Sequence, residues 1–146
     1  MPRAPRDAFA HAVTLLASRE RTREGLRAAL LAKGHDEAEV EAALTRAAQL
    51  GYLDDAKVAQ ARARRDLARG RSRADVARRL ATHGVDETVA AAATRAAAEE
   101  VGHDDEASAR ALLAKRRLTG VKAARLLAAR GFDEALVRRL TGVGDD

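Results

Sequence analysis

The sequence predicts an all-α fold built from tandem repeats of three helices. Of its 146 residues, 37 are alanine, and only Phe9, Tyr52 and Phe132 are aromatic. Alanine, leucine, arginine and glutamate favour helices, whereas the residues that favour strands are too few and too scattered to alternate. A similar pattern also recurs about every fifty positions, which is typical of stacked helical units. We therefore expect about nine helices in an elongated, curved, solenoid-like arrangement.

The clearest repeated element is a helix that begins at a hydroxyl residue. Thr22, Ser72 and Thr119 stand at the three predicted starts, where a side-chain hydroxyl can accept a hydrogen bond from an unpaired backbone amide. Apolar residues four positions apart follow each start, so each helix presents one stripe to be buried. These pairs are Leu26/Leu30, Val76/Leu80 and Ala123/Leu127.

Each of these helices ends in a glycine turn that leads into a third helix. Gly34, Gly84 and Gly131 supply the left-handed residue that follows a helix end, and the residue after each glycine is expected to pack back. The residues before the glycines are cations in the last turn, namely Lys33, His83 and Arg130. Aspartates then cap the third helices. These caps are Asp36, Asp86 and Asp133.

A further helix precedes this pair in each repeat. Asp54-Asp55 recurs as Asp104-Asp105 where such a helix begins. We interpret both pairs as helix caps rather than paired catalytic carboxylates, because adjacent residues on a helix do not face each other. The predicted helices are 7–18, 22–33 and 36–50 in repeat 1 (7–51); 55–69, 73–82 and 86–100 in repeat 2 (52–101); and 105–116, 121–130 and 134–141 in repeat 3 (102–146). Because a three-helix unit buries its own apolar face poorly, we expect the units to stack within one domain over 1–146.

The composition excludes several kinds of protein. The absence of cysteine excludes disulfides and thiolate chemistry. No stretch approaches the roughly 20 continuous apolar residues that cross a bilayer, and the start at Met1 has no signal-peptide pattern. We therefore expect a cytoplasmic protein, and a monomer, because no heptad seam is sustained.

None of the polar motifs predicts an enzyme. Ser18, Ser72 and Ser108 lack the glycine elbow of a hydrolase nucleophile, and no glycine loop suited to cradling phosphate is present. His103 has no partner histidine at metal-ligand spacing, and His11 and His35 stand alone in the sequence. We expect no catalytic residue, no cofactor and no metal site.

One segment resembles a known family. Gly51-Tyr52-Leu53-Asp54-Asp55-Ala56-Lys57-Val58-Ala59, with the Arg-rich helix to Gly70 and the later run Leu80…His83-Gly84-Val85-Asp86, is similar to the RecX family of recombination regulators. The three repeats match that family over roughly residues 8–141. The resemblance implies a protein without enzymatic activity that binds the RecA recombinase filament on single-stranded DNA. It implies that filament growth is limited, which inhibits ATP hydrolysis, strand exchange and the SOS coprotease activity, and that some members bind DNA weakly.

Positive charge is concentrated in the second and third repeats. The chain has a net charge of +5, yet its first fifty residues are nearly neutral. Residues 62–79 contain eight arginines against Asp66 and Asp75, and residues 110–139 contain nine cations against Asp133 and Glu134. On a helical wheel, Arg62, Arg65 and Arg69 lie opposite an apolar stripe. That stripe consists of Ala56, Ala59, Ala63 and Leu67.

We expect these cations to bind the partner, because guanidinium groups pair bidentately with carboxylates and phosphates. The candidate residues are Arg62, Arg65, Arg69, Arg71, Arg73, Arg78, Arg79, Arg116 and Arg117. Three alternatives remain: a solvated helix face in an organism whose proteins are generally rich in arginine, a general DNA-binding module without a recombinase, and a structural adaptor that uses alanine-rich faces. The scarcity of aromatic residues argues against base stacking, so any DNA contact should be dominated by phosphates and sensitive to salt.

Two residues near the join of repeats 1 and 2 are informative. We expect the ring of Tyr52 to be buried there with its hydroxyl in solvent; the alternative is an exposed contact with a partner. Val58 lies off the alanine stripe of its helix, which suggests that this helix is contacted on two faces.

Overall fold

In a computed structural model, residues 7–144 are described and form nine α-helices and no strand. The helices are α1 (Ala8–Ser18), α2 (Arg23–Ala32), α3 (Glu37–Gln49), α4 (Asp55–Ala68), α5 (Arg73–Thr82), α6 (Glu87–Val101), α7 (Asp105–Arg116), α8 (Gly120–Ala129) and α9 (Glu134–Thr141). The predicted all-α class is confirmed, and each predicted helix end lies within one residue of the observed end. No helix in this part of the chain is long and apolar enough to span a membrane.

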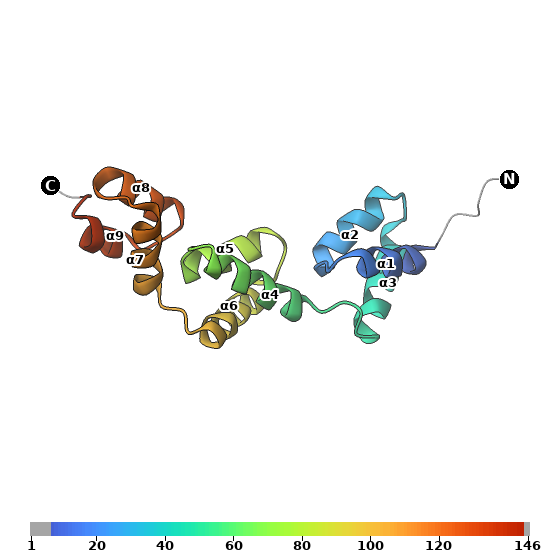
Figure 1. The fold of residues 1–146 in the computed structure, drawn as a ribbon. Coiled ribbons are helices and arrows are strands. Elements are labelled where there is room, and N and C mark those ends of the chain that lie inside the picture. The colour runs from blue at the N-terminus through green and yellow to red at the C-terminus, as the bar shows by residue number, and fades with distance from the viewer. Residues whose placement is uncertain (1–6, 145–146) are drawn as a thin grey trace.

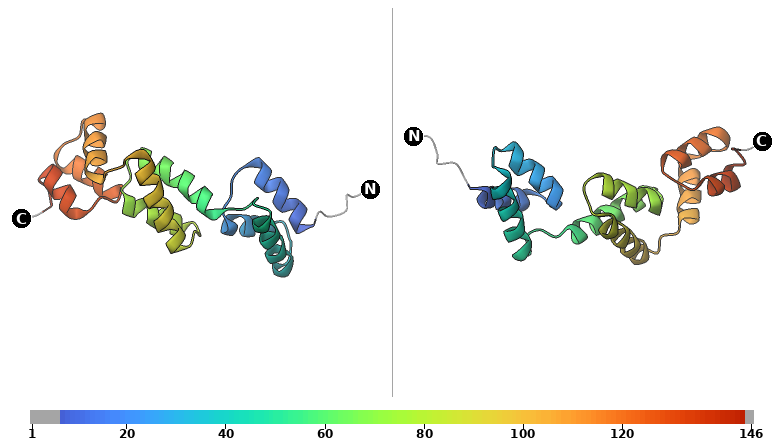
Figure 2. Two further views of the ribbon diagram at one scale, coloured as in Figure 1. Left: turned by 90° about the horizontal axis from the view of Figure 1, so that it is seen from below. Right: turned by 180° about the vertical axis from the view of Figure 1, so that it is seen from behind.

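The helices form three groups that follow one another in a row (Figures 1 and 2). Helices α1–α3 lie at the N-terminal end, α4–α6 in the middle and α7–α9 at the C-terminal end. The row is elongated and gently curved, and α2, α5 and α8 lie along its concave side (Figure 1). The elongated, curved arrangement agrees with the sequence prediction.

Each group has its own apolar core. Leu26 and Leu30 are fully buried in the first group, Val76 in the second and Leu127 in the third. The core of the second group is mostly alanine, and such small side chains allow α4 and α6 to approach closely. The predicted stripes of the second helices are therefore confirmed. The expectation that the units bury their apolar faces chiefly by stacking is wrong, because the three clusters are separate.

Hydroxyl caps begin two of the three second helices. Thr22 Oγ1 accepts a hydrogen bond from the N–H of Gly25, and Ser72 Oγ accepts one from Asp75. Thr119 stands at the same place before α8 but makes no side-chain cap bond, so this part of the prediction is wrong. Thr22 and Ser72 are buried where the next group packs, whereas Thr119 is exposed and water can bond to the first amides of α8.

The glycine turns have the predicted geometry. Gly131 has φ +83°, a left-handed conformation that glycine adopts without the steric cost of a Cβ. The N–H of Phe132 donates to the carbonyl of Leu127, and the N–H of Val85 donates to that of Leu80. These bonds satisfy carbonyls at the helix ends, and both following side chains are buried.

The aspartate pair at the start of α4 connects the first and second groups. Asp54 caps its own helix. Asp55 instead accepts a hydrogen bond of 2.6 Å from the backbone N–H of Arg23, the first residue of α2. The interpretation of the pair as helix caps is confirmed, and the second aspartate caps a helix of the neighbouring group.

The pair at the start of α7 repeats this arrangement between the second and third groups. Asp104 caps α7, while Asp105 accepts a hydrogen bond of 3.1 Å from the backbone N–H of Arg73, the first residue of α5. The Arg73 guanidinium also donates to the carbonyl of His103, at 2.8 Å. One residue thus ties α5 to the start of the third group in two ways.

We call the contacts between the first and second groups the first joint, and those between the second and third groups the second joint. The glycine turns contribute to both joints. A Cβ on Gly84 would lie 2.6 Å from Glu24 Cβ in α2, and a Cβ on Gly131 would lie 2.3 Å from Asp75 Cβ in α5. Each turn therefore packs against the first turn of the second helix in the preceding group. At the second joint, Ser72 Oγ also donates to the Gly131 carbonyl, at 2.7 Å.

Candidate partner-binding surface

A groove of about 300 Å³ lies between α4 and α5. Arg62 and Arg65 of α4 line it together with Arg69, which directly follows the helix, because residues three and four apart share one helix face. Arg79 lines it from α5. The complete lining is Arg62, Arg65, Asp66, Arg69, Arg79, Leu80 and His83. We call this surface the cationic groove.

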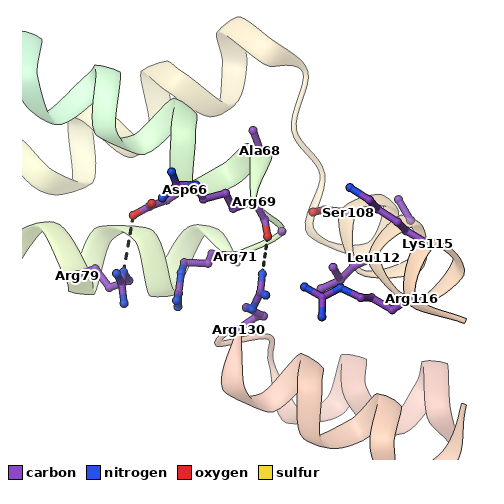
Figure 3. A pocket seen from close by; sticks show the side chains of 12 residues that line it. Asp66, Ala68, Arg69, Arg71, Arg79, Ser108, Leu112, Lys115, Arg116 and Arg130 are labelled. Carbon is purple, nitrogen blue, oxygen red and sulfur yellow. Dashed lines mark hydrogen bonds and ion pairs between the residues drawn. The ribbon is translucent and has the colours of Figure 1, made fainter. Parts of the chain in front are cut away.

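A cleft of about 510 Å³ continues from the groove to the third group. It shares Asp66, Arg69 and Arg79 with the groove, and Asp66 is its one carboxylate (Figure 3). The six cations that line it are Arg69, Arg71, Arg79, Lys115, Arg116 and Arg130. We call this surface the cationic cleft. Groove and cleft together form a continuous cationic band across the second joint.

Close contact between the two groups forms the wall of the cleft. A Cβ on Gly70 would lie 3.2 Å from Leu112 Cδ2, so the loop after α4 passes directly against α7. The Arg130 guanidinium donates to the Arg69 carbonyl (Figure 3). The cations of the cleft are therefore held on two groups whose backbones touch.

Three of the candidate arginines support the fold. The side chain of Asp75 is only 4% exposed, and it pairs with Arg71 at 2.7 Å and also with Arg78. A buried carboxylate needs such partners. Arg73 is engaged at the second joint. The charges of these three residues are therefore committed to contacts within the chain.

Other candidates are free to bind. Among residues 7–144, no hydrogen bond or ion pair is formed by the guanidinium groups of Arg62, Arg65, Arg69, Arg116 and Arg117. Exposed guanidinium groups without a partner can bind carboxylates or phosphates of another molecule.

The structure thus divides the nine predicted residues. Arg62, Arg65, Arg69, Arg71, Arg79 and Arg116 line the groove or the cleft. Arg73, Arg78 and Arg117 line neither. The sequence prediction omitted Lys115 and Arg130, which the cleft includes. Arg130 was interpreted only as a helix-end residue, and its position in the cleft depends on how its turn packs against α5.

Comparison with known proteins identifies the family. The model of the first three-helix domain of RecX matches residues 8–46. The regulatory protein RecX of Stenotrophomonas maltophilia (strain R551-3) is 34% identical, over 92% of this chain and 85% of its own. That of Halorhodospira halophila (strain DSM 244 / SL1) is also 34% identical, over 98% of this chain and 89% of its own. The chain belongs to the RecX family.

A solved structure of the family has the same fold. The crystal structure of RecX from Lactobacillus salivarius superposes with a TM-score of 0.72 over 91% of both chains, at 15% sequence identity. The resemblance found in the Gly51–Ala59 segment and the repeats is confirmed. RecX proteins are regulatory proteins and not enzymes.

In this member of the RecX family, Tyr52 is 55% exposed, so the expectation of a buried ring is wrong. It lines a hollow with Val13, Leu16 and Ala17 of α1, because the loop before α4 passes over the outside of the first group. Val58 is 6% exposed and stands outside the core cluster of its own group, which confirms that α4 is contacted on two faces.

The apolar stripe of α4 begins later than predicted. Ala56 is exposed, whereas Ala59 and Ala63 are fully buried. The first turn of α4 extends beyond the core of the second group, so Ala56 has no apolar surface to cover it.

The histidines make specific contacts. His11 Nδ1 and His35 Nε2 lie 2.5 Å apart, with their rings in an edge-to-face arrangement, so the expectation that they stand alone is wrong. His103 Nε2 lies 2.7 Å from Asp105 Oδ1. In the part of the chain that the structure describes, no three histidine or carboxylate side chains gather as metal ligands.

Ion pairs outside the cationic band neutralise further arginines. Hydrogen bonds from Arg64 and then Gln60 hold the pKa of Glu100 below its ordinary value. Hydrogen bonds from Arg110 and then Arg139 do the same for the pKa of Glu106. Unpaired positive charge therefore remains along the groove and the cleft, and also at exposed positions outside them such as Arg95 and Arg125.

Proposed function

We propose that this chain binds the RecA recombinase filament on single-stranded DNA and inhibits it through the cationic groove and cleft. Inhibition would extend to ATP hydrolysis, strand exchange and the SOS coprotease activity of the filament. Membership of the RecX family supports the partner. The unpaired guanidinium groups of Arg62, Arg65 and Arg69, on one face of α4 and its C-terminal cap, are the observation that carries the choice of surface.

The nine candidate arginines would have different roles. Arg62, Arg65, Arg69 and Arg116 contact the filament, together with the exposed part of Arg79. Positioning residues form a second class, since their charges are used within the chain; they are Arg71, Arg73 and Arg78. Arg117, exposed and beside Arg116, lies at the edge of the contact surface.

The shape of the molecule suits a long partner. Three repeats over residues 7–51, 52–101 and 102–146 would lie along the filament as one monomer in the cytoplasm. The near-neutral first repeat would contribute apolar or neutral contacts, and the second and third would contribute the charge. Contact with DNA in the filament would be weak and made through phosphates, so it would decrease as salt increases.

The test is recombinase ATPase activity on pre-formed filaments, titrated with this protein far below the DNA concentration. The variant Arg62→Gln with Arg65→Gln should need roughly tenfold more protein for half-inhibition, as expected for a loss of about 1.4 kcal/mol. The matched control is Arg95→Gln with Arg125→Gln, which removes the same charge from exposed positions outside the groove and the cleft. The control should inhibit like the unmodified chain.

Two results would contradict the proposal. Equal weakening in both variants would show that only overall charge matters. Inhibition only at protein concentrations that cover the DNA would favour the alternative function, a general DNA-binding helical module that competes for DNA.

A further inference from the structure

Cationic side chains from two helix groups converge on the cationic cleft (Figure 3). Three of them come from the second group and three from the third. They are Arg69, Arg71 and Arg79, and Lys115, Arg116 and Arg130. Asp66 is the one carboxylate in the lining. Like charges on both sides of a joint repel each other, so the joint carries an electrostatic cost that a bound anion would relieve.

Much of this charge is not neutralised within the chain. Arg69, Lys115 and Arg116 form no side-chain hydrogen bond or ion pair among the described residues. Arg79 lies 3.7 Å from Asp66, and its buried Nε has no hydrogen-bond partner. A buried donor without a hydrogen-bond partner calls for an explanation. Because Asp66 is the one carboxylate among six cations in the lining, a bound anion would lower the electrostatic cost of the excess positive charge.

The form of the cleft indicates the size and chemistry of the ligand. Its volume of about 510 Å³ is within the range of small-ligand sites. Leu112 and Gly70 give it an apolar wall, and none of its lining residues is aromatic, so it offers no surface for stacking a base. Several cations at short range favour several negative charges at short range. Adjacent phosphate groups supply these, with oxygens that arginine binds bidentately.

We propose that the cationic cleft binds a free oligophosphate, such as the triphosphate of a nucleoside triphosphate, through its run of adjacent phosphate groups. The bound phosphates contact Arg69 from one group and Lys115 and Arg116 from the other. They therefore bridge the joint and hold the second and third groups at one angle. This binding goes beyond the proposed inhibition of the recombinase and requires no recombinase.

The first measurement is calorimetric titration of the full chain with tripolyphosphate at low salt. The unmodified chain should bind one tripolyphosphate saturably. The variant Lys115→Gln with Arg116→Gln should bind at least about tenfold more weakly. Its matched control is Lys122→Gln with Arg125→Gln, which removes one lysine and one arginine from exposed positions of α8 outside the cleft. The control should bind within about twofold of the unmodified chain, since it leaves every lining residue in place.

Thermal unfolding gives a second readout. Tripolyphosphate should raise the melting temperature of the unmodified chain more than sodium chloride does at the same ionic strength, because a ligand stabilises the state that binds it. The Lys115→Gln, Arg116→Gln variant should lose this difference. Circular dichroism checks that both variants are folded.

Competition by ATP and by a short oligothymidylate identifies the chemical class of the ligand. ATP should displace tripolyphosphate from the unmodified chain, and its own binding should be weakened by the cleft variant. If oligothymidylate binds saturably and neither tripolyphosphate nor ATP does, the cleft is a surface for DNA and the proposal is overturned. It is also overturned if none of the three binds saturably, or if the cleft variant and its control lose affinity equally. A loss of recombinase inhibition would not alter these results, so the two proposals fail separately.

Discussion

Gly131 lies so close to Asp75 that a Cβ on the glycine would be 2.3 Å from the Cβ of the aspartate. Gly131 belongs to the turn after α8, and Asp75 to the first turn of α5. Asp75 in turn pairs with Arg71, which lines the cationic cleft. The position of a cleft arginine thus depends, through Asp75, on a glycine whose own side chain has no charge.

Replacing this glycine tests the second joint. Gly131→Ala should destabilise the protein by about 1–3 kcal/mol more than Gly34→Ala, because it adds overpacking to the cost of a left-handed residue. Gly34 has a similar φ of +95°, but a Cβ there would meet nothing within 4 Å. Urea unfolding of both variants measures the difference. Equal destabilisation would show that the joint can move to accept a methyl group.

Arg71 should be important for stability, because its charge pairs with a buried carboxylate. Arg71→Gln leaves the buried Asp75 with Arg78 as its remaining ion-pair partner, so the free energy of unfolding should fall by about 1–3 kcal/mol. Arg69→Gln is the control. Its side chain has no partner among the described residues, and the change should stay within about 0.5 kcal/mol. Chemical denaturation would refute this assignment if both variants were equally stable.

The end of α7 is strained at Arg117. This residue has φ +54° and is the one non-glycine residue with positive φ in residues 7–144. Arg117→Gly should raise the free energy of unfolding by roughly 0.5–1 kcal/mol, since glycine has no Cβ to clash in this conformation. Arg116→Gly, one residue earlier and inside the helix, should lower it by a similar amount. A melting temperature that falls in both variants would argue against strain at Arg117.

The ion pairs of Glu106 predict a dependence on pH. Its pKa is held below the ordinary value of 4.5 by hydrogen bonds from Arg110 and Arg139. A lowered pKa in the folded state adds stability above the unfolded value, and this is lost as the pH falls through the folded value. Glu106→Gln should therefore melt below the unmodified chain at neutral pH, and the gap should close in acid. Glu99→Gln, an exposed carboxylate without an ion pair in the described part, should show no such gap.

Local chemistry explains why so much of the fold could be predicted from the sequence. Hydroxyl caps, glycine turns and apolar residues spaced four positions apart each involve contacts within one helix or its ends. Because they recur in the sequence, the helix boundaries of all three groups could be predicted. Thr119 departs from its repeat because, within residues 7–144, no other group packs against the start of α8, and its side chain is exposed. The prediction that the Tyr52 ring is buried was wrong because the path of its loop over α1 depends on contacts between residues far apart in the sequence.

The candidate surface was predictable only in part. The spacing of Arg62, Arg65 and Arg69 places them on one face of a helix, and the structure brings them together in the groove. Nothing in the spacing shows that Arg71 and Arg78 meet a buried carboxylate of α5. Nor does it show that Arg130 reaches across a joint to Arg69. Such contacts arise from the packing of one group against the next.

The most direct test of the contact surface is photo-cross-linking to recombinase filaments on single-stranded DNA. The chain has no cysteine, so Ala68→Cys places a labelled residue in the cationic cleft without removing an arginine. Ala38→Cys, at an alanine of α3 in the first group that is also exposed, is the matched control. We expect cross-links to the recombinase from residue 68 at several times the yield from residue 38. Equal yields, or cross-links from residue 68 to DNA alone, would contradict the account.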